Sequence, residues 1–162
     1  MGYTHYWYKV AELSQDSFDN FVRDFYQVLP TFRTLLEQTE NDSQSLEVNN
    51  QVVVFNGIQE NSHETFFFDR VMDRKENFVQ YHNEQSGEKT HIFNFCKTAQ
   101  KPYDIAVTCA LIIAKKNFGD NIIVSSDGGQ EEWLEAIDLC QNTLGYGESF
   151  NVEEGVFEEI LA

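Results

Sequence analysis

The first residues of the chain constrain its fold most strongly. Residues 3–9 read Tyr-Thr-His-Tyr-Trp-Tyr-Lys, and aromatic side chains at this density are costly to leave loose in water. We therefore expect residues 3–10 to form a β-strand. Alternation would place four side chains on one face: Tyr3, His5, Trp7 and Lys9. One face of this strand can supply a core, whereas the other carries more hydrogen-bonding groups than a core needs, which indicates a pocket.

The charge of the chain limits its partners. Among 162 residues, 27 Asp and Glu oppose 11 Lys and Arg, which gives a net charge of −16. Nucleic acids and anionic membranes require a positive surface, so we expect neither as a partner. One small anionic ligand in a local basic pocket stays compatible with this charge. Solubility is the simpler explanation of the charge.

The cysteines indicate a reducing compartment. Cys96, Cys109 and Cys140 are odd in number and widely spaced, unlike a disulfide framework or a zinc motif. With no signal peptide recognisable at the start, we expect a cytoplasmic protein, in the host cytoplasm if a phage encodes it. The longest apolar run, residues 105–114, is too short to span a bilayer. We expect no metal and no cofactor.

The periodicity of the chain predicts alternating strands and helices. Ser14 can cap a helix whose apolar stripe continues through Pro30 to Leu36. The remaining predicted elements are strands at 51–55, 63–71, 78–81, 91–98 and 121–126, and helices at 102–117 and 130–144.

This order predicts an α+β fold, a mostly antiparallel sheet with helices packed on it, with a ferredoxin-like core plus additions as one form. Residues 1–146 would make a single ligand-binding domain, large enough to bury roughly 70% of the surface of its unfolded chain. Residues 147–162 would form an acidic C-terminal tail that also holds apolar side chains. This tail either folds back on the domain or joins two copies into a homodimer.

Polar side chains gather where the predicted strands end, and strand ends commonly hold ligands. We take the following residues as candidate ligand-binding residues: His5, Tyr6, Trp7, Asn56, His63, Glu64, Thr65, Lys97, Thr98, Tyr103, Ser125, Ser126 and Asp127.

Each group of candidates has a functional and a structural interpretation. Lys97 and Thr98, followed by a helix start, could bind phosphate, or could be a surface lysine and a cap. Asp127 with the preceding serines could bind a polyol, or could cap the last helix. His63 and Glu64 are adjacent and would point to opposite strand faces, which weakens a shared metal site.

Several short motifs together resemble a family of small, largely uncharacterised phage and bacterial proteins. These motifs are the opening Met-Gly-Tyr-Thr-His-Tyr-Trp, Asn56-Gly57, His63-Glu64-Thr65-Phe66, Phe95-Cys96-Lys97-Thr98-Ala99, Lys101-Pro102-Tyr103-Asp104 and Ser125-Ser126-Asp127-Gly128. The likeness covers nearly residues 1–146 and names no reaction. In general character the chain is also similar to phage proteins that sequester nucleotide immune signals, which implies a compact protein with a polar, aromatic-lined pocket.

These observations favour a binding protein over an enzyme. The leading hypothesis is sequestration of a small nucleotide-derived, ADP-ribose-type immune signal, which would block host defence, with Trp7 or Tyr6 stacking on a base. The alternative is a hydrolase or phosphodiesterase for a similar ligand, with His63 or His5 as base and Glu64 or Asp127 in support. A third hypothesis is an acidic interaction module that mimics nucleic acid.

Overall fold

The computed structural model describes residues 2–37, 46–72, 80–82 and 90–157. Its elements, in chain order, are β1 (Thr4–Lys9), α1 (Gln15–Phe32), β2 (Glu47–Val48), β3 (Val52–Phe55), β4 (Phe66–Asp69), β5 (Gln80–His82), β6 (Thr90–Lys97), α2 (Asp104–Phe118), β7 (Ile122–Ser126), α3 (Gln130–Leu144), β8 (Phe150–Asn151) and β9 (Val156–Phe157). The predicted elements are present with ends shifted by a few residues. Residues 78 and 79 of the predicted strand 78–81 lie outside the described residues.

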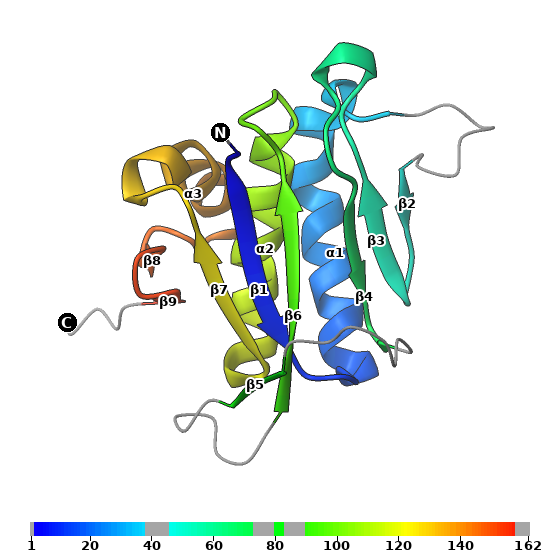
Figure 1. The fold of residues 1–162 in the computed structure, drawn as a ribbon, viewed down its shortest axis with the longest axis vertical. Coiled ribbons are helices and arrows are strands. Elements are labelled where there is room, and N and C mark those ends of the chain that lie inside the picture. The colour runs from blue at the N-terminus through cyan, green and yellow to red at the C-terminus, as the bar shows by residue number, and fades with distance from the viewer. Residues whose placement is uncertain (1, 38–45, 73–79, 83–89, 158–162) are drawn as a thin grey trace.

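The predicted α+β class, a mostly antiparallel sheet covered by helices, is confirmed. The main sheet has the order β5-β6-β1-β7, and β1 is antiparallel to both of its neighbours. Helix α2 therefore joins two strands, β6 and β7, that run in the same direction on either side of β1. A second sheet, β2-β3-β4, places β4 beside β6 (Figure 1). The hydrogen-bonded order β7-β1-β6-β5, with α1 after β1 and α2 between β6 and β7, matches the strand order of a ferredoxin-like core, to which the sheet β2-β3-β4 is an addition.

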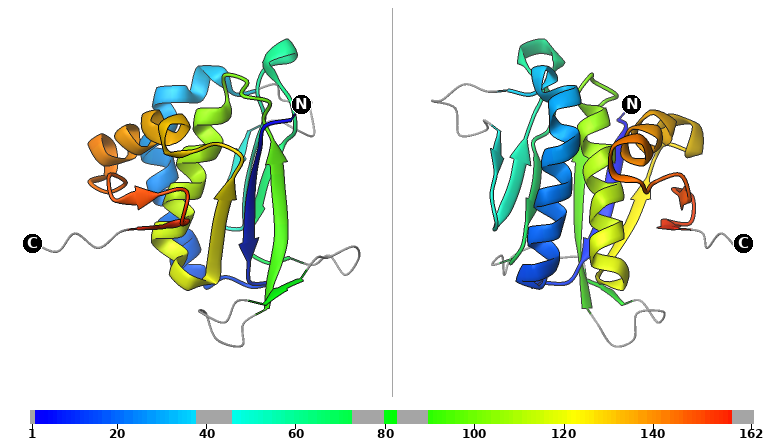
Figure 2. Two further views of the ribbon diagram at one scale, coloured as in Figure 1. Left: turned by 60° about the vertical axis from the view of Figure 1, so that its left-hand side comes forward. Right: turned by 180° about the vertical axis from the view of Figure 1, so that it is seen from behind.

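All helices of the described residues cover the same side of the sheets (Figure 2). On β1, His5, Trp7 and Lys9 face the helices and are buried, whereas Tyr6 and Tyr8 face the opposite side. The ring of Trp7 packs 5.2 Å from Phe66, measured between ring centroids. The odd-numbered residues are therefore those that β1 contributes to the core.

The first helix ends earlier than the sequence predicts. The Ser14 hydroxyl accepts a hydrogen bond from the Ser17 amide, as a helix cap does. The α-helix stops at Phe32, two residues after Pro30, and a 3₁₀ turn follows at Arg33–Leu35. Proline removes a backbone donor and crowds the preceding turn, which explains the early stop. The apolar stripe nevertheless continues to Leu36, which is fully buried.

The C-terminal segment folds back on the body as far as the structure describes it. The Phe150 ring packs against Trp133 of α3 at 5.5 Å. Gly155 has a φ of +67° and lies so close to β7 that a Cβ there would stand 2.3 Å from the Val124 carbonyl oxygen. Only glycine meets both conditions. Residues 158–162 of the predicted tail lie outside the described residues, and the homodimer stays a prediction.

None of the helices in the described residues combines the length and the apolar character needed to cross a bilayer.

Buried and exposed side chains alternate on β4, so two neighbouring phenylalanines can be compared as a test of the fold. Phe68 is fully buried between β4 and α1, whereas its neighbour Phe67 is 41% exposed. We expect Phe68→Ala to lower the free energy of unfolding by about 3–5 kcal/mol, because it leaves a cavity. Phe67→Ala should cost less than about 1 kcal/mol. Urea unfolding of both variants measures the difference, and equal losses would contradict the register of β4.

Candidate functional site

Most candidate residues meet at one end of the main sheet, where β1 begins and β6 and β7 end (Figure 1). The strand register places His5 opposite Cys96 on β6 and opposite Ser126 on β7. The segment before β4 joins the same end, because the Glu64 amide donates to the Lys97 carbonyl oxygen at 3.1 Å. The candidates on β1, at the end of β6 and at the end of β7 therefore come together, and the segment that holds Asn56, His63, Glu64 and Thr65 lies beside them.

His5 is at the centre of this end and is fully buried. Its Nε2 lies 2.7 Å from Oδ1 of Asp104, in the first turn of α2, and its Nδ1 lies 2.8 Å from the Ser126 hydroxyl. That hydroxyl oxygen also accepts hydrogen bonds from the Gly128 amide at 2.9 Å and from Trp133 Nε1 at 3.2 Å. Both acceptor sites of the hydroxyl are therefore used, so its proton points to Nδ1 and the His5 ring carries its proton on Nε2.

Asp104 occupies the helix start where the sequence predicted a phosphate. Its carboxylate accepts a hydrogen bond from the hydroxyl of Thr98, which is fully buried. A phosphate at this helix start would meet that negative charge at close range. The side chain of Lys97 is exposed, and by alternation it belongs to the sheet face opposite the helices.

Two aromatic candidates, Trp7 and Tyr103, are buried in the core. Trp7 is 1% exposed and Tyr103 is fully buried, so neither ring is accessible. Trp7 packs in the aromatic core, and the Tyr103 hydroxyl donates to the Glu64 carbonyl oxygen at 2.6 Å. The backbone thus satisfies the hydroxyl of Tyr103, as is common for a buried tyrosine, whereas the indole nitrogen of Trp7 has no hydrogen-bond partner among the described residues.

Asn56 organises the loop before β4 rather than facing solvent. Its Oδ1 accepts hydrogen bonds from the amides of Gly57 and His63, at 2.7 and 3.1 Å. Its Nδ2 donates to the carbonyl oxygen of His63 and to the hydroxyl of Thr65. The side chain is thus fully used within the loop, while His63 itself is exposed. The Glu64 carboxylate accepts from the Lys97 amide at 2.9 Å.

Asp127 fastens the start of β1 to the end of β7. One carboxylate oxygen accepts from the Thr4 amide at 3.0 Å, and the other accepts from the Tyr6 hydroxyl at 3.1 Å. The pKa of Tyr6 is raised, first by burial and then by this carboxylate. Ser125 lies opposite Tyr6 in the register and is exposed.

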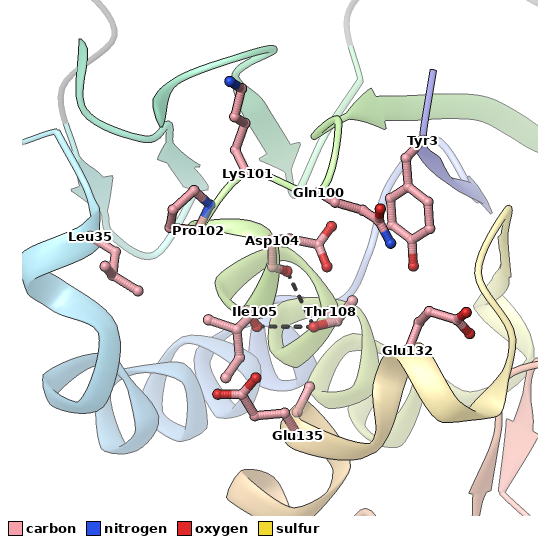
Figure 3. A pocket seen from close by; sticks show the side chains of 11 residues that line it. Tyr3, Leu35, Gln100, Lys101, Pro102, Asp104, Ile105, Thr108, Glu132 and Glu135 are labelled. Carbon is pink, nitrogen blue, oxygen red and sulfur yellow. Dashed lines mark hydrogen bonds between the residues drawn. The ribbon is translucent and has the colours of Figure 1, made fainter. Parts of the chain in front are cut away.

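A pocket of about 330 Å³ lies next to this network, between Tyr3 and the first turns of α2 and α3 (Figure 3). It is lined by Tyr3, Leu35, Gln100, Lys101, Pro102, Asp104, Ile105, Thr108, Glu132, Glu135 and Ala136. The lining holds three carboxylate residues and one lysine, and in Figure 3 the Lys101 amino group points away from the carboxylates. The interior of the pocket is acidic.

The pKa of the Tyr3 phenol is affected by these acidic groups. Its oxygen is buried, and no group in the described part of the chain makes a hydrogen bond to it. Burial raises the pKa of Tyr3 to about 12, and the charges of Asp104 and Glu132 act in the same direction. A Cβ at Gly128 would lie 2.0 Å from the Tyr3 oxygen, so a larger residue there would displace the Tyr3 ring.

The loop that forms the rim of the pocket is strained. Ala99 and Gln100 have φ angles of +53° and +56°, a left-handed conformation that non-glycine residues rarely adopt. Such residues cost about 1–3 kcal/mol each and cluster at functional sites. The strand end holds them in place, because the amides of Thr98 and Ala99 both donate to the Tyr3 carbonyl oxygen.

None of the residues that line the pocket was among the candidate ligand-binding residues. The polar and charged lining residues that were missed are Tyr3, Gln100, Lys101, Asp104, Thr108, Glu132 and Glu135. A signal existed for Tyr3, which shares a strand face with His5. The two glutamates carry no signal, because acidic residues in the first turns of a helix commonly complement its dipole.

Among the described residues, no group of three His, Cys, Asp or Glu side chains could hold a metal ion.

The cysteines are buried thiols, and Cys96 lacks the lowered pKa that a neighbouring lysine could produce. Burial raises the pKa of Cys96 to about 12, with a further contribution from Glu64. Cys109 and Cys140 are also buried and make no disulfide.

Thiol labelling tests this arrangement. At pH 8 the thiolate fraction of Cys96 should be about a thousandfold lower than that of an unperturbed thiol. We expect Ellman's reagent to react slowly with the native protein and to modify all cysteines after denaturation in guanidinium chloride. Rapid reaction of one native thiol would contradict the burial of these side chains.

The chain matches no protein-family model, no curated protein and no solved structure.

Proposed function

We propose that this protein binds a small molecule in the pocket between Tyr3 and the starts of α2 and α3. The observation that carries the proposal is one cavity of about 330 Å³ whose lining holds the buried phenol of Tyr3 and three carboxylate residues. This volume is at the lower end of the range for ligand sites and suits a nucleoside-sized group. The strained rim at Ala99 and Gln100 supports the same assignment.

The chemistry of the lining favours hydroxyl groups of the ligand. Carboxylates accept hydrogen bonds from sugar hydroxyls, as in dinucleotide sites where an acidic residue binds the ribose. A phosphate inside the pocket would be repelled by Asp104, Glu132 and Glu135. In our proposal the sugar of a nucleotide-derived ligand enters the pocket, and its phosphate lies outside, near Lys101. Among functions that bind a nucleotide-derived ligand, we propose sequestration of an ADP-ribose-type immune signal, which is also the leading hypothesis from the sequence.

A hydrolase is the second candidate, and one observation favours it. Ser126, His5 and Asp104 are aligned by hydrogen bonds of 2.8 and 2.7 Å, as in a nucleophile–base–acid arrangement. Two features weigh against it. His5 is fully buried, and the Ser126 oxygen already accepts two hydrogen bonds, so it has no lone pair left for attack. We therefore rank binding above turnover.

Calorimetry with adenosine, ADP-ribose and a cyclic dinucleotide tests the proposal. We expect at least one to bind, and Glu132→Gln to weaken that binding about tenfold, because a charged hydrogen-bond acceptor becomes neutral. Glutamine keeps the contact to the Gly129 amide that Glu132 makes at the helix start. Heat denaturation should return the ligand intact, whereas a hydrolase would return product.

Glu131→Gln is the matched control. Glu131 lies in the same helical turn and carries the same charge, but it does not line the pocket. Equal weakening by the two variants would show a general charge effect, and absence of binding across the panel would contradict the proposal.

A further inference from the structure

The face of the main sheet that the helices leave open is aromatic. In the strand register Tyr6 of β1 lies opposite Phe95 of β6, and Tyr8 lies opposite Phe93. These side chains alternate with the buried residues of the same strands and therefore point away from the helices (Figure 2). The outer face of such a sheet is normally polar.

The four rings form one continuous patch. Phe93 lies at its centre, with centroid distances of 6.0 Å to Tyr6, 5.2 Å to Tyr8 and 5.7 Å to Phe95. Phe95 is 48% exposed, which is unusual for a phenylalanine in the middle of a central strand. Nothing in the described part of the chain covers this ring fully. The half-exposed ring of Phe95 is therefore the part of the patch that a partner would contact first.

Charge distinguishes between the possible occupants. Aromatic patches on central strands can stack the bases of single-stranded RNA, but that binding relies on basic groups that contact the phosphates. This chain has a net charge of −16, which repels nucleic acid and equally repels a second copy of itself. At the end of the patch, the Asp127 carboxylate accepts a hydrogen bond from the Tyr6 hydroxyl. One cation, Lys97, lies on the same face, and its backbone amide donates to the Glu64 carboxylate.

We propose that this open face binds an arginine- or lysine-rich segment of a partner protein. Ring faces carry negative charge and attract cations within about 6 Å of the centroid, and arginine stacks flat on such rings. The overall negative charge of the chain would increase the association rate. This site is independent of the pocket, which lies on the helix side of the sheet.

The test is calorimetric titration with a short peptide that alternates arginine and glycine, with oligothymidylate as the competing occupant. We expect the peptide to bind and Phe95→Ser to weaken it about fivefold, because one cation–aromatic contact is lost. The matched control is Leu134→Ser on α3, since Leu134 is also 48% exposed and neither change alters the net charge. Equal affinities of the two variants, or binding of oligothymidylate in place of the peptide, would overturn the proposal.

A measurement on the unmodified protein covers the case in which Phe95→Ser fails to fold. The ring resonances of Tyr6 and Tyr8 should shift as the arginine peptide is added, and those of Tyr26 on α1 should not. Tyr26 is the control because it is 48% exposed on the opposite side of the molecule. Shifts confined to Tyr26, or equal for all three tyrosines, would overturn the proposal.

Discussion

The buried imidazole of His5 joins three elements that are distant in the sequence. Its two nitrogens contact the hydroxyl of Ser126, at the end of β7, and the carboxylate of Asp104, at the start of α2. Trp133 of α3 binds the same hydroxyl. A buried polar network is stable only when its members are all satisfied, and removal of one member leaves the others unpaired. The pocket depends on this network, because Asp104 belongs to both.

Because its side chains alternate, strand β1 contributes residues both to the helix side of the sheet and to the open face. His5, on the helix side, holds the network beside the pocket, whereas Tyr6 and Tyr8 supply the open aromatic face. Lys9 also points into the core, where it lies 3.2 Å from the Asp69 carboxylate. A buried lysine requires such a partner, because an unpaired charge in the interior is very costly. His5 and Lys9 are thus structural on the helix side, whereas Tyr6 and Tyr8 are half-buried on the other side.

The sequence predicts the elements of this fold well and the site only in part. Helix and strand positions follow from apolar periodicity, so α3 and β7 were located closely. Periodicity also separates the two faces of β1, but it does not tell which face the helices cover. Trp7 was therefore assigned to a ligand, although it packs against Phe66 in the core. The pocket combines residues from β1, α2 and α3, and only the tertiary arrangement brings Tyr3, Asp104 and Glu132 together.

The protonation of His5 tests the central network most directly. Long-range ¹H–¹⁵N NMR of the native protein at neutral pH distinguishes the two ring nitrogens. The hydrogen-bond arrangement predicts a proton on Nε2, facing Asp104, and an unprotonated Nδ1 that accepts from Ser126. A proton on Nδ1, alone or together with one on Nε2, would contradict the network from which the site is built.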